Sequence, residues 1–392
     1  MSSAESRGRA VVNGRGAGRW ERGHPWIFRS DLSEPPRDEA GVVTVSDARG
    51  KPLGVALWSP RSEISLRLLD RNPDAEIGHA WWRNKIAAAF SRRRPVATQT
   101  NAYRVVHGEA DGCPSLVIDR YDRWIVVQLL SAGIETARAN IVSAIRDELT
   151  PDGILARHDV PVRAREGLSQ DVELLSGDVP REIEVDEHGV RYLAAPWDGQ
   201  KTGAFLDQRE NRLLAASIAR GRALDCFSYH GSFALHLARG ADRVTAVDVS
   251  QEALSRAAEN AKRNGLTNID FQEADAFDML RTAERSRATY DTIVLDPPAF
   301  AKSKSALPAA VRGYKEINLR AMRLLSRGGM LLTASCSFHL SRAMFLDMLR
   351  EAASDSGRRV ALRSTHGQPL DHPEVLTIPE TGYLKSAIIE AL

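Results

Sequence analysis

The chain has 392 residues, of which 43% are hydrophobic and 27% are charged, and its formal net charge is +2. This composition is typical of a globular protein with two or three domains. Three scattered cysteines exclude a disulfide framework and a metal site of the zinc type, and the lack of a long apolar run excludes a membrane span, so we expect a cytoplasmic protein without a bound metal.

Residues 9–70 are predicted to form a small β module. Three short apolar runs, GVVTVSD, LGVALWS and EISLRLLD, are separated by turn residues, which is typical of strands. The first 29 residues hold six arginines against two glutamates, interleaved with Trp20, Trp26 and Phe28. Arginine contacts phosphates and aromatic rings stack on bases, so the cluster favours an RNA-facing edge, although each ring taken singly is more typical of a core residue.

The middle of the chain is predicted to form an α+β unit. A linker at 72–78 precedes a helix over 79–94, whose Arg92–Arg94 end we expect to be solvated. The runs SLVID and WIVVQLL predict a hairpin, and a helix over 134–149 and a strand at ILARHD follow it. Residues 182–195 predict a second hairpin. No pattern in this region indicates chemistry.

The segment QKTGAFLDQRENR, residues 200–212, precedes the next predicted helix. It gathers three basic and two acidic side chains around a Phe-Leu pair. Asp207 with Glu210 three residues later predicts a capped helix start.

Residues 223–250, ALDCFSYHGSFALHLARGADRVTAVDVS, predict a strand–turn–helix–strand unit of a parallel sheet. Gly231 opens the helix, and Asp248 ends the second strand, 17 residues later. An acid at that place accepts hydrogen bonds from ribose hydroxyls. The turn lacks the G-x-G-x-x-G that a pyrophosphate needs, which disfavours a dinucleotide. S-adenosylmethionine keeps the ribose without phosphate, so a single glycine suffices.

From residue 223 onward, strands and helices alternate, which predicts one doubly wound α/β sheet. Ligands bind at the carboxyl ends of the strands in such sheets. The residues at those ends are Phe227–Gly231, Asp248, Asp275, Asp296 and Cys336. Asp248 suits the ribose diol and Asp275 the exocyclic amine of adenine, although either could be a solvated loop acid. Three acids and one thiol are thus expected in one crevice.

Two of these residues indicate the reaction. Asp296 begins an Asp-Pro-Pro-Ala-Phe turn, and methyltransferases that modify amines and bases use such a turn to hold a flat nitrogenous ring. Carbon 5 of a pyrimidine is a weak nucleophile, but a thiolate that adds to carbon 6 activates it. We expect Cys336 to supply that thiolate and Asp296 to hydrogen-bond the ring.

Six motifs, LDCFSYHGSF, VDVSQEAL, LDPPAF, RGYKEIN, TASCS and GQKTGAFLDQRENR, occur with HPWIF near the start and HPE…GYLK near the end. With them the chain resembles the bacterial large-subunit ribosomal RNA cytosine-C5 methyltransferases that carry an N-terminal PUA domain. The resemblance implies a β-barrel-like PUA domain over 1–75, a central α+β domain over 76–195 and a Rossmann-like class I methyltransferase domain over 196–392.

The resemblance also implies the site. Cys336 and Asp296 match the family's nucleophile and base-contacting acid. The residues expected to bind S-adenosylmethionine are Phe205, Gln208, Arg209, Asp225, Phe227, Ser228, Gly231, Asp248, Val249, Asp275, Ala276 and Asp296. One departure is that two-cysteine RNA enzymes have Pro-Cys where this chain has Pro-Pro, so Asp296 or water must take the carbon-5 proton. We assign Cys226 a packing role.

Other functions remain open from the sequence. Methylation of a nitrogen of guanine or adenine in RNA would use the same turn without a cysteine. A non-catalytic RNA-binding factor of ribosome assembly would keep the domain plan, and a nicotinamide oxidoreductase is disfavoured by the missing glycines. Large-subunit ribosomal RNA is the expected partner, without a membrane. The sequence is silent on oligomeric state, so a homodimer stays open.

Overall fold

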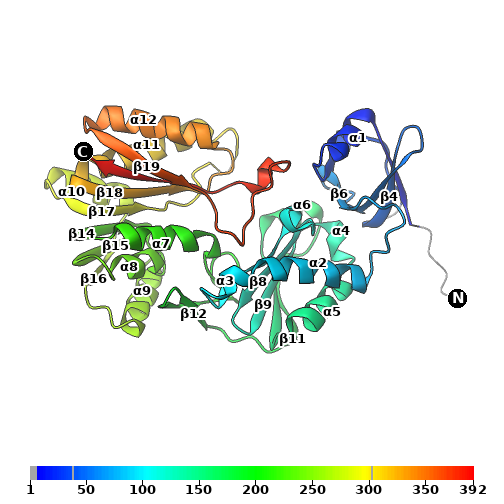
Figure 1. Cartoon of the computed structure of the whole chain (residues 1–392), viewed down its shortest axis with the longest axis horizontal. Helices are drawn as coiled ribbons and strands as arrows, with labels where there is room; N and C mark the ends of the chain where they lie inside the picture. Colours follow the sequence, from blue (N-terminus) through cyan, green and yellow to red (C-terminus); the bar gives the residue numbers. More distant parts are fainter. Residues whose placement is uncertain (1–6, 38, 302) are drawn as a thin grey trace. The chain divides into compact units, whose positions relative to one another are not determined.

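The computed structural model describes residues 7–37, 39–301 and 303–392, and the chain divides into two compact units (Figure 1). Unit 1 comprises Met1–Val185, Ala194–Leu206 and Leu370–Thr381. Unit 2 comprises Asp186–Leu193, Asp207–Pro369 and Gly382–Leu392. The chain therefore passes between the units more than once, and the three linear domains expected from the sequence stay a prediction.

The N-terminal part of unit 1 contains a six-stranded sheet with the order β2-β6-β5-β4-β1-β3. Its strands are β1 (Arg9–Val12), β2 (Trp26–Phe28), β3 (Leu32–Glu34), β4 (Gly41–Asp47), β5 (Pro52–Trp58) and β6 (Ile64–Asp70). The last three confirm the predicted strands. Helix α1 (Gly14–Glu21) covers the sheet because Trp20 packs in its core with Ile27 and Leu66.

The aromatic rings of the predicted RNA-facing edge are buried to different extents. Trp20 is a core residue, and its indole donates a hydrogen bond to the carbonyl of Pro25. Trp26 and Phe28 are half-buried, and the guanidinium of Arg19 lies 4.5 Å from the Phe28 ring centroid. The Arg19–Phe28 stack is therefore the part of the cluster that keeps both a cation and a partly exposed ring.

The second part of unit 1 is a five-stranded sheet, β11-β10-β9-β8-β7, packed against helices. The elements are α2 (His79–Arg92), α3 (Arg94–Ala97), β7 (Ala102–His107), β8 (Leu116–Tyr121), β9 (Trp124–Leu129), α4 (Ala132–Glu135), α5 (Arg138–Leu149), β10 (Gly153–Arg157), α6 (Pro161–Glu166) and β11 (Val172–Gly177). The β8–β9 hairpin is confirmed. The single helix predicted over 134–149 is wrong, because it breaks where the Thr136 hydroxyl bonds the Gly133 carbonyl.

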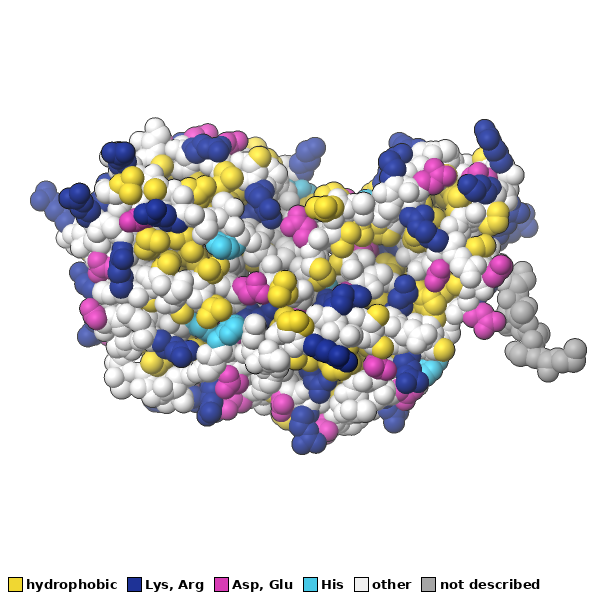
Figure 2. All heavy atoms as spheres, in the orientation of Figure 1, with side chains coloured by type: hydrophobic (Ala, Val, Ile, Leu, Met, Phe, Trp, Pro, Cys, Tyr) yellow, Lys and Arg dark blue, Asp and Glu magenta, His cyan; other side chains and the backbone are white. Residues whose placement is uncertain are grey.

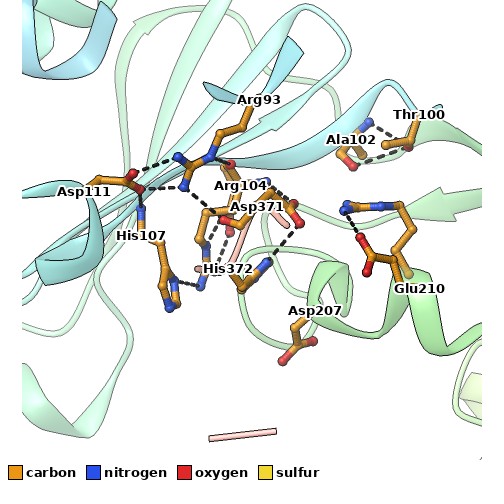
Figure 3. Close-up of polar contacts among 12 residues, drawn as sticks. Arg93, Thr100, Ala102, Arg104, His107, Asp111, Asp207, Glu210, Asp371 and His372 are labelled. Carbon is orange, nitrogen blue, oxygen red and sulfur yellow. Dashed lines mark hydrogen bonds and ion pairs between the residues drawn. The ribbon is translucent and has the colours of Figure 1, made fainter. Parts of the chain in front are cut away.

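The prediction that the Arg92–Arg94 run is only a solvated helix end is wrong for Arg93. Its side chain is 1% exposed and forms a two-bond ion pair with Asp111, at 2.7 and 2.5 Å (Figure 3). Arg93 also donates to the backbone carbonyl of Asp371, and the backbone N–H of Arg104 donates to the Asp371 carboxylate. These bonds hold the returning segment Leu370–Thr381 in unit 1.

Unit 2 is built on a seven-stranded sheet with the order β16-β15-β14-β17-β18-β20-β19. Its strands are β14 (Arg222–Cys226), β15 (Arg243–Asp248), β16 (Ile269–Glu273), β17 (Tyr290–Leu295), β18 (Leu325–Ser335), β19 (Val360–His366) and β20 (Lys385–Ala391). The first five run parallel, and β20 is antiparallel to β18 and β19. The predicted doubly wound sheet is confirmed, and its strand order reverses between β14 and β17.

Helices cover both faces of this sheet (Figure 1). They are α7 (Arg209–Ile218), α8 (Ser232–Leu237), α9 (Gln251–Arg263), α10 (Ala276–Arg285), α11 (Leu307–Leu324) and α12 (Arg342–Ser356). Side chains alternate across β14, so Ala223 packs with α7 and α8, whereas Leu224 and Cys226 pack with α10, α11 and α12. Cys226 is thus a buried core residue.

The remaining strands form a separate two-stranded sheet, β12 (Ile183–Glu187) with β13 (Val190–Ala194). His188 and Gly189 at its turn have φ of +53° and +75°, which confirms the predicted hairpin. No helix within the described residues is long and apolar enough to cross a membrane. Lys and Arg side chains are spread over the face shown in Figure 2 and are interspersed with acidic ones.

Gly231 precedes α8 and has a φ of +84°. A Cβ atom at this position would lie 2.8 Å from the Cβ of Ala257, so the residue allows α8 to approach α9. We expect Gly231→Ala to lower the free energy of unfolding by roughly 3 kcal/mol, through the left-handed backbone and the clash together. Chemical unfolding of unit 2 measures this loss.

Gly265→Ala is the matched control. Gly265 also has a positive φ, +65°, but nothing lies within 4 Å of its added Cβ. We expect a loss of about 1 kcal/mol from the backbone alone. Equal losses in the two variants would contradict the packing role of Gly231.

Candidate functional site

The register of neighbouring strands brings the predicted site residues to one edge of the unit 2 sheet. Cys226 at the end of β14 pairs with Leu295, the residue before Asp296. Leu295 in turn pairs with Thr333 of β18, three residues before Cys336. The carboxyl ends of β14, β17 and β18 therefore lie side by side, at the reversal of strand order where α/β sheets bind ligands.

The turn after β14 has an unusual backbone. Phe227 and Tyr229 have φ of +66° and +50°, a region that residues other than glycine rarely adopt. The turn is held by bonds from the Ser228 N–H to the Val247 carbonyl and from the Tyr229 N–H to the Asp248 carboxylate, at 3.0 and 2.9 Å. Strain of this kind persists where the surrounding structure enforces it and is common at ligand sites.

Asp248 connects this turn to the end of β15. One of its carboxylate oxygens accepts from Tyr229 and the other accepts from the backbone N–H of Ser250, each at 2.9 Å. A carboxylate oxygen can accept more than one bond, so Asp248 is oriented without being saturated. Val249 follows it with 66% of its surface exposed, which leaves an apolar side chain at the rim.

Asp225 is an acid of the site whose burial disfavours its charged form. It is 1% exposed, and neither carboxylate oxygen makes a hydrogen bond of ordinary geometry within the described part of the chain. Burial, followed by the negative charges of Asp296 and Asp248, raises the pKa of Asp225 well above its ordinary value. Ser228 is also buried, and its hydroxyl likewise makes no hydrogen bond of ordinary geometry with the described residues. The site thus contains buried polar atoms that a ligand would satisfy.

Asp275 caps a helix, a role that the sequence did not predict. It is the N-cap of α10, and its Oδ1 accepts from the backbone N–H groups of Phe277 and Asp278, at 2.8 and 3.2 Å. Oδ2 is the oxygen that an adenine amine would have to use. Ala276, the first helical residue, is buried, so it can only offer a close apolar contact.

The Asp296-Pro-Pro-Ala-Phe300 turn is held by polar and aromatic contacts. The Gln208 amide donates to Asp296 at 2.6 Å, and Asn211 donates to the Gln208 carbonyl oxygen at 2.6 Å. Phe300 packs 4.6 Å from the Tyr314 ring and 6.4 Å from that of Phe227, measured between centroids. Gln208 was expected at the cofactor, and in the structure it orients the proposed base-contacting acid.

The segment 200–212 is arranged differently from the prediction. Asp207 is not an N-cap: Leu206–Gln208 form a 3₁₀ turn, α7 begins at Arg209, and the carboxylate of Asp207 instead accepts from the hydroxyl of Tyr383 at 2.7 Å. Arg209 is fully buried. Phe205 belongs to unit 1, where the Lys201 ammonium lies 4.7 Å from its ring centroid.

Cys336 directly follows β18 and is half-buried, whereas Cys113 and Cys226 are buried. The hydroxyl of its neighbour Ser337 pairs with Tyr314 at 2.9 Å and accepts from the backbone N–H of Ala301 at 3.1 Å. The thiol thus sits on a loop tied to both α11 and the residues after the Asp-Pro-Pro turn. This loop joins the two parts of the chain that were predicted to carry the reaction.

Two residues of this region escaped the sequence analysis. Lys385 opens β20 and pairs with Ser335 in the sheet, so it lies beside the thiol loop. Phe338 is 52% exposed two residues after Cys336. The only available signal was position. Lys385 begins a predicted strand, and an antiparallel strand begins at the edge where its parallel neighbours end, but one sequence does not show strand direction.

Comparisons with known proteins agree with this architecture. A family model described as S-adenosylmethionine-dependent methyltransferase matches residues 138–377, and a PUA-like domain model matches residues 11–71. A protein of Shigella boydii, named ribosomal RNA large subunit methyltransferase I, is 38% identical over 93% of this chain and 94% of its own length. A protein of the same name from Erwinia tasmaniensis is 39% identical over the same shares.

Solved structures show the same fold. A candidate S-adenosylmethionine-dependent methyltransferase from Streptococcus mutans has a TM-score of 0.83 at 22% identity, over 97% of this chain and 99% of that one. A second candidate methyltransferase, complexed with S-adenosylhomocysteine, has a TM-score of 0.84 at 22% identity with the same coverage. The predicted fold class, a class I methyltransferase preceded by a PUA-like domain, is confirmed.

S-adenosylmethionine is the cofactor, and the residues present fit it. The buried carboxylate of Asp225 and the buried hydroxyl of Ser228 could bond polar groups of the cofactor, and the exposed Val249 offers an apolar surface next to Asp248. By contrast, no cluster of three or more His, Cys, Asp or Glu that could hold a metal occurs in the described ranges. The individual contacts of the twelve predicted cofactor residues stay predictions.

Because Asp225 is buried, we expect its replacement by asparagine to increase the stability of the cofactor-free protein and to weaken the binding of the cofactor. An acid whose folded-state pKa is raised loses stability as pH rises past its unfolded pKa, about 3.9, toward the folded value. Asp225→Asn removes this penalty, so we expect the cofactor-free protein to gain about 1 kcal/mol at pH 7 and little at pH 3. Thermal unfolding at the two pH values measures the gain.

Cofactor affinity is expected to move the other way. Calorimetry should show S-adenosylmethionine binding to Asp225→Asn weakened about tenfold or more, roughly 1.4 kcal/mol. Asp347→Asn is the control, since Asp347 pairs with Arg350 on the exposed surface of α12. A variant at Asp225 that is less stable at pH 7 and binds normally would refute its assignment to the site.

Proposed function

Because the chain belongs to the family of S-adenosylmethionine-dependent methyltransferases with an N-terminal PUA-like domain, we propose that it methylates carbon 5 of a cytosine in large-subunit ribosomal RNA. The relatives are named as methyltransferases of large-subunit ribosomal RNA, and they align with nearly the whole length of this chain. Their names therefore support ribosomal RNA as the substrate class. The choice of carbon 5 rests on one observation, a half-buried thiol at the strand end next to the Asp-Pro-Pro turn.

Cys336 is the proposed nucleophile. Its sulfur, as the thiolate, forms a bond to carbon 6 of the cytosine, and the electron pair displaced from the 5,6 double bond makes carbon 5 nucleophilic. When bound, the cofactor would supply an electrophilic methyl group on its sulfonium and would leave as the neutral thioether S-adenosylhomocysteine, with the electron pair of the broken sulfur–carbon bond. Carbon 5 takes that methyl group, then loses its proton, and the electrons of the carbon–hydrogen bond restore the double bond as the sulfur leaves carbon 6.

Asp296 is the proposed partner of the ring. Its Oδ1 accepts from the Gln208 amide, which orients the carboxylate at the end of β17. In the proposal, the Asp296 side chain hydrogen-bonds the nitrogen edge of the ring as charge builds there. Asp296 or water is the proposed acceptor of the carbon-5 proton.

A PUA-like domain in front of the catalytic domain is consistent with a structured RNA substrate. The Arg19–Phe28 stack in this domain offers a cation and a ring, which are the groups that contact phosphate and base. A ribosomal RNA substrate also agrees with the cytoplasmic location expected from the sequence. The proposal includes no oligomeric state.

Covalent trapping tests the nucleophile. RNA that carries 5-fluorocytidine at the target cannot lose fluorine from carbon 5, so the protein should stay attached to it in the presence of S-adenosylmethionine. We expect Cys336→Ala to abolish the adduct and reduce methylation at least a thousandfold, with cofactor affinity unchanged. Denaturing gels measure the adduct, and calorimetry measures cofactor binding.

Cys113→Ala is the matched control, since Cys113 is a buried thiol of unit 1 and burial raises its pKa to about 12. This variant should still form the adduct. Mass analysis of the methylated nucleoside then identifies the modified atom. N-methylated guanine or adenine, or full methylation by Cys336→Ala, would overturn the carbon-5 proposal, and no methyl transfer at all would indicate a non-catalytic RNA-binding protein.

A further inference from the structure

Lys385 is a buried cation next to the loop that carries Cys336. Its side chain is only 4% exposed, although lysine is rarely buried without a charged partner. In the sheet it pairs with Ser335, and its ammonium donates 2.7 Å hydrogen bonds to the backbone carbonyls of Ser337 and Tyr383. Cys336 is therefore enclosed between two residues that Lys385 contacts directly.

The charges around Lys385 are unusual. Burial lowers its pKa to about 8, the Cys336 thiolate acts in the opposite direction, and Arg342 at the start of α12 lowers it further. No carboxylate of the described residues is among the groups that shift this pKa. Tyr314 of α11 contacts the loop through Ser337, and burial raises its pKa, so it stays neutral. His339 lies on the loop itself and, like Arg342, cannot supply a negative charge. The thiolate is thus the anion available to this ammonium.

We propose that Lys385 is a positioning residue that stabilises the thiolate form of Cys336 and fixes its loop through the Ser337 carbonyl. An ammonium has three N–H donors, so the two carbonyl bonds do not exhaust it. The interaction is reciprocal: ionisation of Cys336 stabilises the charge of Lys385, and removal of the ammonium makes ionisation of the thiol less favourable. The inference deepens the proposed function, because it assumes that Cys336 acts as the nucleophile.

The test measures the reactivity of Cys336 without RNA. Iodoacetamide alkylates the thiolate, so the rate of labelling of the Cys336 peptide as a function of pH, followed by mass spectrometry of the full-length protein after digestion, reports the thiol pKa. In the wild-type protein we expect a midpoint below about 8.5, the value of a free cysteine. A wild-type midpoint at or above that value would overturn the proposal without any variant.

Lys385→Met should raise the midpoint by about one pH unit, which is a tenfold slower labelling at pH 7. Lys385→Arg keeps the positive charge and should restore most of the rate. Lys315→Met is the control: Lys315 lies on the same unit, but its ammonium pairs with Glu351 and Asp355 on the surface. It should leave the midpoint unchanged, and calorimetric binding of S-adenosylmethionine verifies that each variant is folded.

The outcomes separate this inference from the function on which it rests. An unchanged midpoint in folded Lys385→Met would refute the role of Lys385, even if Cys336→Ala abolishes trapping on RNA. A raised midpoint in Lys385→Met together with normal methylation by Cys336→Ala would uphold the electrostatic coupling and refute the proposed reaction.

Discussion

The alignment of strand ends in unit 2 is the constraint on which the rest of the site depends. Parallel pairing of β14 with β17 and of β17 with β18 brings Asp225, Asp296 and Cys336 to one edge, although they are far apart in the sequence. Antiparallel pairing of β20 adds Lys385 from the other direction. A one-residue change of register would turn these side chains to the opposite face, so the hydrophobic cores on both faces hold the chemistry in place.

Charge is distributed unevenly along this edge. Carboxylates lie at the ends of β14, β15 and β17, and burial together with the charges of Asp296 and Asp248 raises the pKa of Asp225. The thiol follows β18, and Lys385, which opens β20, donates a hydrogen bond to the loop that carries the thiol. The carboxylates at the ends of β14, β15 and β17 suit a cationic cofactor. The ammonium of Lys385 suits a thiolate at Cys336. The cofactor-free protein is therefore expected to be destabilised by the same groups that bind its ligand.

The loop contacts explain how rigid elements support this arrangement. Tyr314 on α11 bonds Ser337 and packs against Phe300, so a single helix positions both the thiol loop and the Asp-Pro-Pro turn. Gln208 orients Asp296 and is itself bonded by Asn211 of α7. The proposed reacting groups are thus held by side chains that come from helices on both sides of the sheet.

The sequence by itself determined the local elements and the class of the fold. Apolar runs, turn residues and the position of Gly231 predicted the β module, the hairpins and the alternating strands and helices, because these depend on short-range periodicity. It also indicated Asp296 and Cys336, since each ends a predicted strand. Tertiary structure decided what depends on long-range contacts: Arg93 became a buried ion-pair partner, Asp207 lost its capping role, and Gln208 was directed to Asp296. Lys385 gained its place only because β20 runs antiparallel, and strand direction is set by pairing between segments that no local pattern encodes.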